Sequence, residues 1–173
     1  MKIILGPITY PKSEAIIVPV NSSGVMTRGV LKEIVKDGWN KVAKEVNKVV
    51  QSKELELGDC FSTDSGRLKR RKCYRIYYGV VKRFPNDLVS LHVIRSALSN
   101  CLNQAIRDGI ENISISNFSI GQGELNIEAV SRLTVEECLK KEYKIGIKIV
   151  DTNKEFVNNV KKLLGMNDEC TNE

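Results

Sequence analysis

Two glycine-bearing stretches of this sequence have the residue types that bind phosphate groups. The first, NSSGVMTRGV, contains Gly24 and Gly29 and follows the apolar run AIIVPV, and the second, SIGQGEL, contains Gly121 and Gly123 and follows NISISNF. Glycine lets backbone N–H groups approach a ligand closely, and N–H groups at the start of a helix attract anions. Two such loops could bind a diphosphate from two sides, although a single such loop is more often only a tight strand-to-helix turn.

A lysine and an asparagine at strand ends are further candidates for chemistry. Lys82 ends the strand-like run RIYYGVVK, where an amine could act as a nucleophile or a base. The alternative is an ordinary strand-end lysine that faces water, because Arg83 beside it is also basic. Asn21 could contact a ligand or could bond its own backbone in a turn. The single histidine, His92, falls within a helical pattern, and we expect no metal or other cofactor.

Length and composition favour one globular domain. The chain has 173 residues, 42% of them hydrophobic, and we expect residues 1–165 to form the domain and the polar residues 166–173 to be a disordered tail. No run reaches the roughly 18 apolar residues of a membrane span, and the first apolar segment is short for a signal peptide. We therefore expect a cytoplasmic monomer with no membrane partner. The five cysteines form no CxxC pair, which indicates reduced thiols, mostly in the core.

The chain is basic and favours an anionic partner. Its formal net charge is +6, and the densest basic run is GRLKRRKCYR, residues 66–75. Because this run lies between two strand-like segments, a solvated turn is the favoured interpretation, and nucleic acid stays open as a partner.

Alternating apolar runs and helical patterns predict an α/β fold. Strands are expected at residues 2–5, 14–20, 54–63, 72–81, 112–118 and 144–151. Helices are expected at residues 30–51 with a break near Gly38, 86–109 with Asn86 or Asp87 as cap and Gly109 as stop, 126–142 and 153–165. This order favours a three-layer α/β/α domain with a mixed central sheet, and a ligand outside the carboxyl ends of its strands.

Taken together, the motifs resemble the macro domain, an ADP-ribose-binding module. The resemblance rests on EAIIVPVNSSGVMTRGV, on SIGQG, and on GPIT near the start, which is similar to the family's Gly-Asp-Ile-Thr. It covers about residues 2–151 and looks closest to the branch that includes terminal ADP-ribose glycohydrolases and DNA ADP-ribosyl glycohydrolase antitoxins. That branch carries a catalytic lysine at a central strand end, and the matching residue here is Lys82.

The resemblance also implies a set of site residues. Asn21 matches the asparagine that contacts the distal ribose, and Glu124 and Asn126 are the candidate partners of Lys82 in catalysis. The implied ligand-binding residues are Ile8, Asn21, Gly24, Val25, Met26, Thr27, Arg28, Gly29, Val30, Ser119, Ile120, Gly121, Gln122 and Gly123.

One departure from the family affects adenine recognition. The family's adenine-binding aspartate falls at Pro7, which has no side-chain acceptor. A lost charge-assisted hydrogen bond costs about 1.5–3 kcal/mol, so the sequence predicts weak ADP-ribose binding with poor selectivity among bases.

Three functions therefore remain open. The chain could bind ADP-ribose or a related nucleotide and remove it from an ADP-ribosylated macromolecule. It could bind the same ligand without turnover. It could also have a degenerate pocket and bind RNA or DNA through a basic face.

Overall fold

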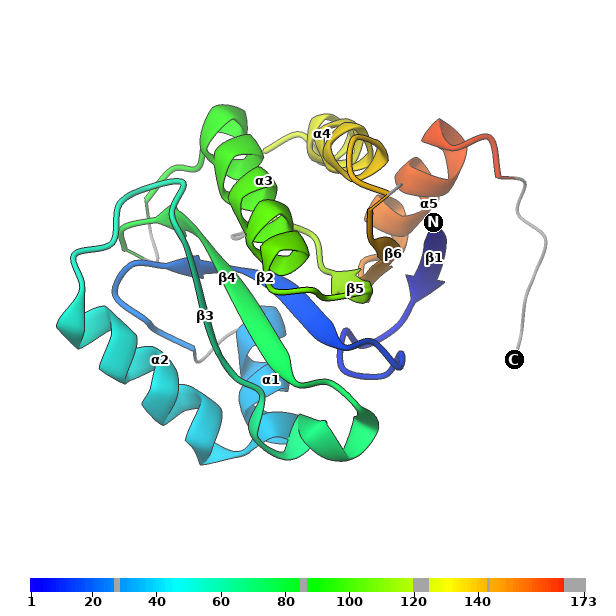
Figure 1. Ribbon diagram of the computed structural model, residues 1–173. Coiled ribbons are helices and arrows are strands. Elements are labelled where there is room, and N and C mark those ends of the chain that lie inside the picture. The colour runs from blue at the N-terminus through cyan, green and yellow to red at the C-terminus, as the bar shows by residue number, and fades with distance from the viewer. Residues whose placement is uncertain (27–28, 85–86, 120–124, 143, 167–173) are drawn as a thin grey trace.

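A six-stranded sheet forms the centre of the molecule, with helices on both faces (Figure 1). The computed structural model describes residues 1–26, 29–84, 87–119, 125–142 and 144–166. The strands are β1 (Lys2–Leu5), β2 (Ala15–Asn21), β3 (Cys60–Asp64), β4 (Arg75–Lys82), β5 (Asn112–Ile115) and β6 (Gly146–Asp151). The helices are α1 (Gly29–Gly38), α2 (Asn40–Ser52), the 3₁₀ helix η1 (Gly66–Arg71), α3 (Leu91–Arg107), α4 (Ile127–Leu139) and α5 (Lys154–Leu163).

The strand order is β1-β6-β5-β2-β4-β3, and all neighbours are parallel except β3, which runs antiparallel to β4. Helices α3, α4 and α5 cover one face, and α1 and α2 cover the other (Figure 1). The three-layer α/β fold with a mixed sheet is therefore confirmed.

The central strands β2 and β4 have continuous apolar sequences because both of their faces are buried. Every residue of β2 is buried, and so is every residue of β4 after Arg75, because both faces of these strands are covered by helices. The edge strand β3 instead alternates between partly buried and buried residues.

The predicted helix break near Gly38 is confirmed. Helix α1 ends at Gly38, and Trp39 has φ 68°, outside the right-handed helical region, before α2 begins at Asn40. The connection between β3 and β4, expected as a basic turn, is η1.

The predicted cap of the longest helix is wrong. The hydroxyl of Ser90 accepts a hydrogen bond from Val93 N at 3.2 Å and caps α3. Asp87 instead accepts from Phe84 N at 2.9 Å, which closes a turn ahead of the helix, and Asn86 lies outside the described residues. The predicted stop at Gly109 is confirmed, since the helix ends at Arg107 and Gly109 has φ 75°.

The cysteines of the described residues are free thiols, as expected. Cys73, Cys101 and Cys138 are buried, and Cys60 is partly buried. Burial raises the pKa of Cys73 to about 12, which keeps that thiol protonated.

Within the described ranges there is no cluster of metal-ligating side chains, and no helix is long and apolar enough to span a membrane. The tail was expected at residues 166–173. Of these, only Met166 belongs to the described residues, so the expected disorder stays a prediction.

Phe118, the residue before the second loop, packs on Gly79 of β4. A Cβ on Gly79 would lie 2.8 Å from Phe118 Cε1 and 3.1 Å from Ala97 Cβ. We expect Gly79→Ala to lower the free energy of unfolding by about 1–3 kcal/mol, because the methyl group overpacks this contact. Urea denaturation followed by circular dichroism measures the loss.

Phe118→Leu supplies the control, because it makes room beside residue 79. The double variant should lose less free energy of unfolding than the sum of the losses of the two single variants. Strict additivity would mean that the ring and the glycine are not energetically coupled.

Candidate functional site

The two glycine-bearing loops begin at the same edge of the sheet. Strands β2 and β5 are parallel neighbours, with Ile17 opposite Ile115, so their carboxyl ends lie side by side. The first loop follows Asn21 and the second follows β5. Residues 27–28 of the first loop and 120–124 of the second lie outside the described residues. They include the predicted site residues Thr27, Arg28, Ile120, Gly121, Gln122, Gly123 and Glu124.

Asn21 organises the start of the first loop. Its side-chain oxygen accepts from Val25 N at 3.2 Å and from the Ser23 hydroxyl, and its amide nitrogen donates to Val25 O at 3.4 Å. Its backbone oxygen accepts from Gly24 N at 3.1 Å. The turn role considered for Asn21 is thus present in the structure. The N–H groups of Gly24 and Val25 are used inside the loop, so a phosphate would have to be bound further along it.

The two glycines of this loop have different surroundings. Gly24 has φ 71°, and a Cβ there would lie 3.1 Å from Val50 Cγ2, so its close approach is to α2. Gly29, the first residue of α1, has φ 55°, and a Cβ there would meet no atom of the described residues within 4 Å. As far as the described residues go, the space beside Gly29 is open, and the start of α1 carries the N–H groups that favour an anion.

Several predicted ligand-binding residues have their side chains in or against the core. Ile8 and Met26 are buried in the cluster beneath α1 and α2, and Val30 packs against it. Val25, by contrast, is exposed. The side chains of Ile8 and Met26 therefore stabilise the base of the first loop, and only their backbone could face a ligand.

Lys82 is the most unusual residue of this edge. It ends β4 opposite Asn21 of β2, and it is only 2% exposed. Alternation along the strand places it on the same face as Tyr78 and Val80, the face covered by α1 and α2. The water-facing alternative is therefore wrong: this is a buried amine at the carboxyl end of a central strand. Its carbonyl oxygen accepts from Ser22 N at 2.8 Å, which ties it to the first loop.

Ser116 was missed by the sequence analysis. It follows β5 at the same edge, is buried, and donates its backbone N–H to Ile17 O at 3.1 Å. Among the described residues its hydroxyl is the buried side-chain group that has no hydrogen-bond partner. A buried hydroxyl of this kind is commonly paired with an ordered water or a ligand. A serine after an apolar strand gives no sequence signal of this kind.

Asn126 and Ser119 lie at the two ends of the second loop. The side-chain oxygen of Asn126 accepts from Glu128 N at 2.8 Å and from Ala129 N at 3.2 Å, which caps α4. Ser119 N donates to Asn117 Oδ1 at 2.8 Å. Asn126 is thus the N-cap of α4, and its catalytic role stays a prediction.

We expect Ser116→Ala to leave the free energy of unfolding unchanged or slightly higher, because it removes a buried hydroxyl without a protein partner. Ser114→Ala is the matched control two residues away. Its hydroxyl lies 2.7 Å from the Ser13 hydroxyl, and its loss should cost about 1 kcal/mol. Chemical denaturation of both variants tests this. A clear loss of stability in Ser116→Ala would show that the protein itself satisfies that hydroxyl.

Comparison with known proteins gives a consistent set of matches. A family model described as Macro domain matches residues 17–134. An uncharacterized protein of Aquifex aeolicus (strain VF5) is 27% identical over 168 residues, which cover 96% of this chain and 98% of that protein.

Solved structures share the fold at low sequence identity. The macrodomain of Mycobacterium tuberculosis DarG has a TM-score of 0.74 at 20% identity, covering 86% of this chain and 96% of that chain. The Trypanosoma brucei macrodomain in complex with ADP-ribose has a TM-score of 0.79 at 17% identity, covering 94% of this chain and 68% of that chain.

Proposed function

Because this chain belongs to the macro domain family, we propose that it binds ADP-ribose at the carboxyl edge of its sheet and releases it from a modified macromolecule. The observation that carries the proposal is the burial of Lys82 at that edge, opposite Asn21 and tied to the first loop. The similarity to a macrodomain bound to ADP-ribose supports the choice of ligand.

The diphosphate would lie against the start of α1. The N–H groups of Gly24 and Val25 are already bonded to Asn21, whereas none of the described residues fills the space beside Gly29 at the N-terminus of a ten-residue helix. Backbone N–H groups there, together with the helix dipole, stabilise a bound anion. The hydroxyl of Ser116, buried at the same edge, would donate to or accept from the bound ligand.

Lys82 would act as the nucleophile. Its amine attacks C1 of the ribose, and the bond from C1 to the modified group breaks as that group leaves with a proton. The resulting glycosylamine opens to an imine, and water hydrolyses the imine to give free ADP-ribose and the original lysine. Burial would hold the amine in one orientation and exclude bulk water from C1.

A non-catalytic reader of ADP-ribose is the second candidate. It is favoured by Asn126, whose side chain caps α4, and by Pro7, which lacks the carboxylate that would select adenine. A reader would bind the same ligand at the same edge and give no release.

Reductive trapping distinguishes the enzyme from the reader. With ADP-ribose and cyanoborohydride, we expect a covalent adduct that peptide mapping assigns to Lys82. Lys82→Met preserves most of the side-chain volume, so the variant should fold, bind ADP-ribose within about threefold of wild type by calorimetry, and release ADP-ribose at least a hundredfold more slowly. Equal release by wild type and Lys82→Met would exclude the lysine mechanism, and no release by wild type would favour the reader.

A pair of substitutions at Gly29 tests the phosphate site. Gly29→Ala and Gly29→Val both strain a backbone at φ 55°, but only valine adds branched bulk to the open space. We expect Gly29→Val to reduce ADP-ribose affinity at least tenfold more than Gly29→Ala does in calorimetry.

Gly109→Val controls for strain alone, because Gly109 has φ 75° and an open Cβ position after α3. It should lower the melting temperature without changing affinity. Normal ADP-ribose binding by folded Gly29→Val would place the diphosphate elsewhere.

A further inference from the structure

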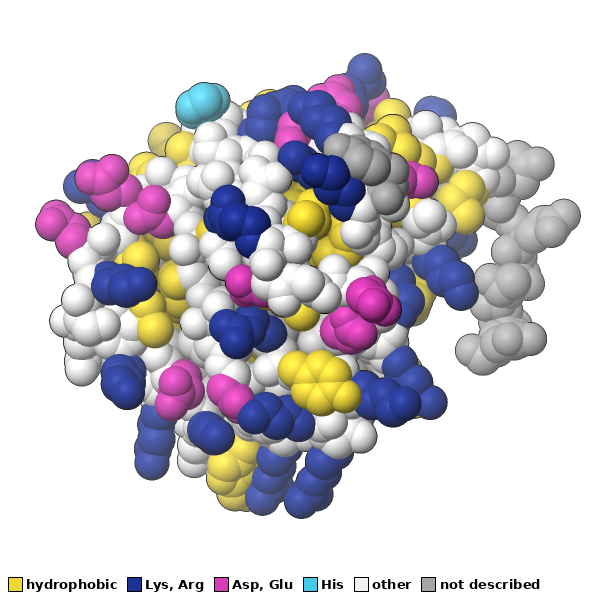
Figure 2. All heavy atoms as spheres, in the orientation of Figure 1, with side chains coloured by type: hydrophobic (Ala, Val, Ile, Leu, Met, Phe, Trp, Pro, Cys, Tyr) yellow, Lys and Arg dark blue, Asp and Glu magenta, His cyan; other side chains and the backbone are white. Residues whose placement is uncertain are grey.

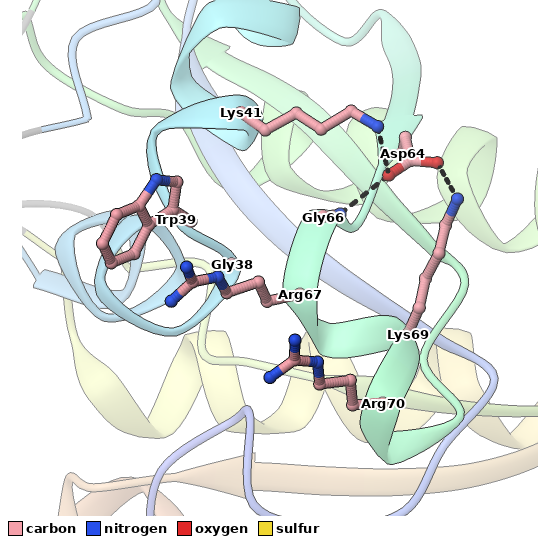
Figure 3. A pocket seen from close by; sticks show the side chains of 8 residues that line it. All are labelled: Gly38, Trp39, Lys41, Asp64, Gly66, Arg67, Lys69 and Arg70. Atoms are coloured by element: carbon pink, nitrogen blue, oxygen red, sulfur yellow. Dashed lines mark hydrogen bonds and ion pairs between the residues drawn. The ribbon is translucent and has the colours of Figure 1, made fainter.

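A second candidate site lies at the opposite end of the sheet from Lys82. A pocket of about 410 Å³ opens between the α1–α2 connection and η1, and we call it the basic pocket (Figure 3). It is lined by Gly38, Trp39, Lys41, Asp64, Gly66, Arg67, Lys69 and Arg70. Asp64 pairs with Arg75 at the start of β4, whereas Lys82 ends that strand. Strand β4 runs from Arg75 to Lys82, and at about 3.3 Å per residue its two ends, and with them the two sites, are roughly 23 Å apart.

Two glycines bring the walls of the basic pocket together. A Cβ on Gly66 would overlap the carbonyl oxygen of Gly38, and Gly66 has φ 60°. The end of α1 and the start of η1 are therefore in backbone contact, although they are far apart in sequence. This contact fixes Trp39 beside Arg67.

Trp39 and Arg67 form an exposed stacked pair. The guanidinium carbon of Arg67 lies 3.7 Å from the centroid of the Trp39 ring, and Trp39 is 53% exposed. Figure 3 shows the Arg67 side chain reaching from η1 to the indole. An exposed indole and a planar guanidinium are both surfaces on which a nucleic-acid base stacks.

Cations surround this stacked pair. Asp64 is paired with Lys69 and, at 3.7 Å, with Lys41, and it accepts from Gly66 N at 2.8 Å (Figure 3). Because an ammonium group has three donors, one ion pair leaves each lysine able to bind a phosphate as well. Arg70 lines the same pocket. The lining thus carries four cations against one carboxylate.

The positive charge extends beyond the pocket. Arg71, Lys72 and Arg75 continue the basic run along η1 and into β4, and Tyr74 among them is exposed. Figure 2 shows Lys and Arg side chains gathered at the lower end of the molecule, where Figure 1 places η1 and the α1–α2 connection. A row of cations of this kind is the electrostatic feature by which proteins bind a phosphate backbone.

We infer that the basic pocket binds single-stranded nucleic acid, with an unpaired base stacked on the Trp39–Arg67 pair and the flanking phosphates on Lys41, Lys69 and Arg70. The stacked aromatic surface favours this partner over an acidic peptide, which offers charge but no planar base. A duplex keeps its bases stacked internally and would contact the cations alone. This inference does not depend on the ADP-ribose site.

Fluorescence anisotropy with labelled oligothymidylate and oligouridylate of about 15 nucleotides tests the inference. We expect binding of one or both that weakens steeply with salt, and Trp39→Ala should reduce it roughly fivefold or more, whereas Trp39→Phe should retain most of it. Arg70→Glu should weaken binding and flatten the salt dependence. Lys154→Glu, the same charge change at an exposed lysine of α5, should change binding less than about twofold.

Several outcomes would overturn the inference. These are no binding at low salt, equal binding of a duplex, equal competition by polyglutamate, or wild-type affinity in folded Trp39→Ala. Displacement of the oligonucleotide by excess ADP-ribose would also overturn it, because the strand would then occupy the opposite edge of the sheet. Circular dichroism melting of each variant confirms that the fold is intact.

Discussion

The parallel pairing of β2 with β4 is the constraint on which the rest of the molecule depends. Both strands are covered on both faces, so a slip of one residue would move every side chain to the opposite face and disrupt its packing against the helices. This register sets Asn21 opposite Lys82, after a shift between Val20 and Asn21. The hydrogen bond from Ser22 N to Lys82 O extends the pairing into the first loop. The geometry of the candidate site is thus a direct result of core packing.

The same pairing fixes the opposite end of the sheet. Arg75 begins β4 opposite Ala15, and the short η1 segment before it is held against the end of α1. A strand buried along nearly its whole length acts as a rigid spacer between its two ends. The protein therefore presents two chemically different surfaces, one with a buried amine and one with exposed cations and an indole, at a fixed separation.

Sequence reasoning predicted local features well and long-range contacts poorly. The order of strands and helices and the break after Gly38 follow from apolar spacing and glycine placement, which are local. The burial of Lys82 was not predictable, because it depends on helices that are distant in sequence. Gly24 suggested a ligand, yet its neighbour is Val50 of α2. The stacking of Arg67 on Trp39 likewise needs the close approach of two separate segments.

The position of β1 at the sheet edge has a consequence for folding. Its partner in the sheet is β6, so Lys2 pairs with Lys148, near the other end of the domain. Closing so long a loop costs conformational entropy, so we expect β1 to join the sheet late in folding. The segment after β1 leads through Pro7 to the core residue Ile8 beneath the first loop. We therefore expect the packing beneath the first loop to be completed only after β1 has paired with β6.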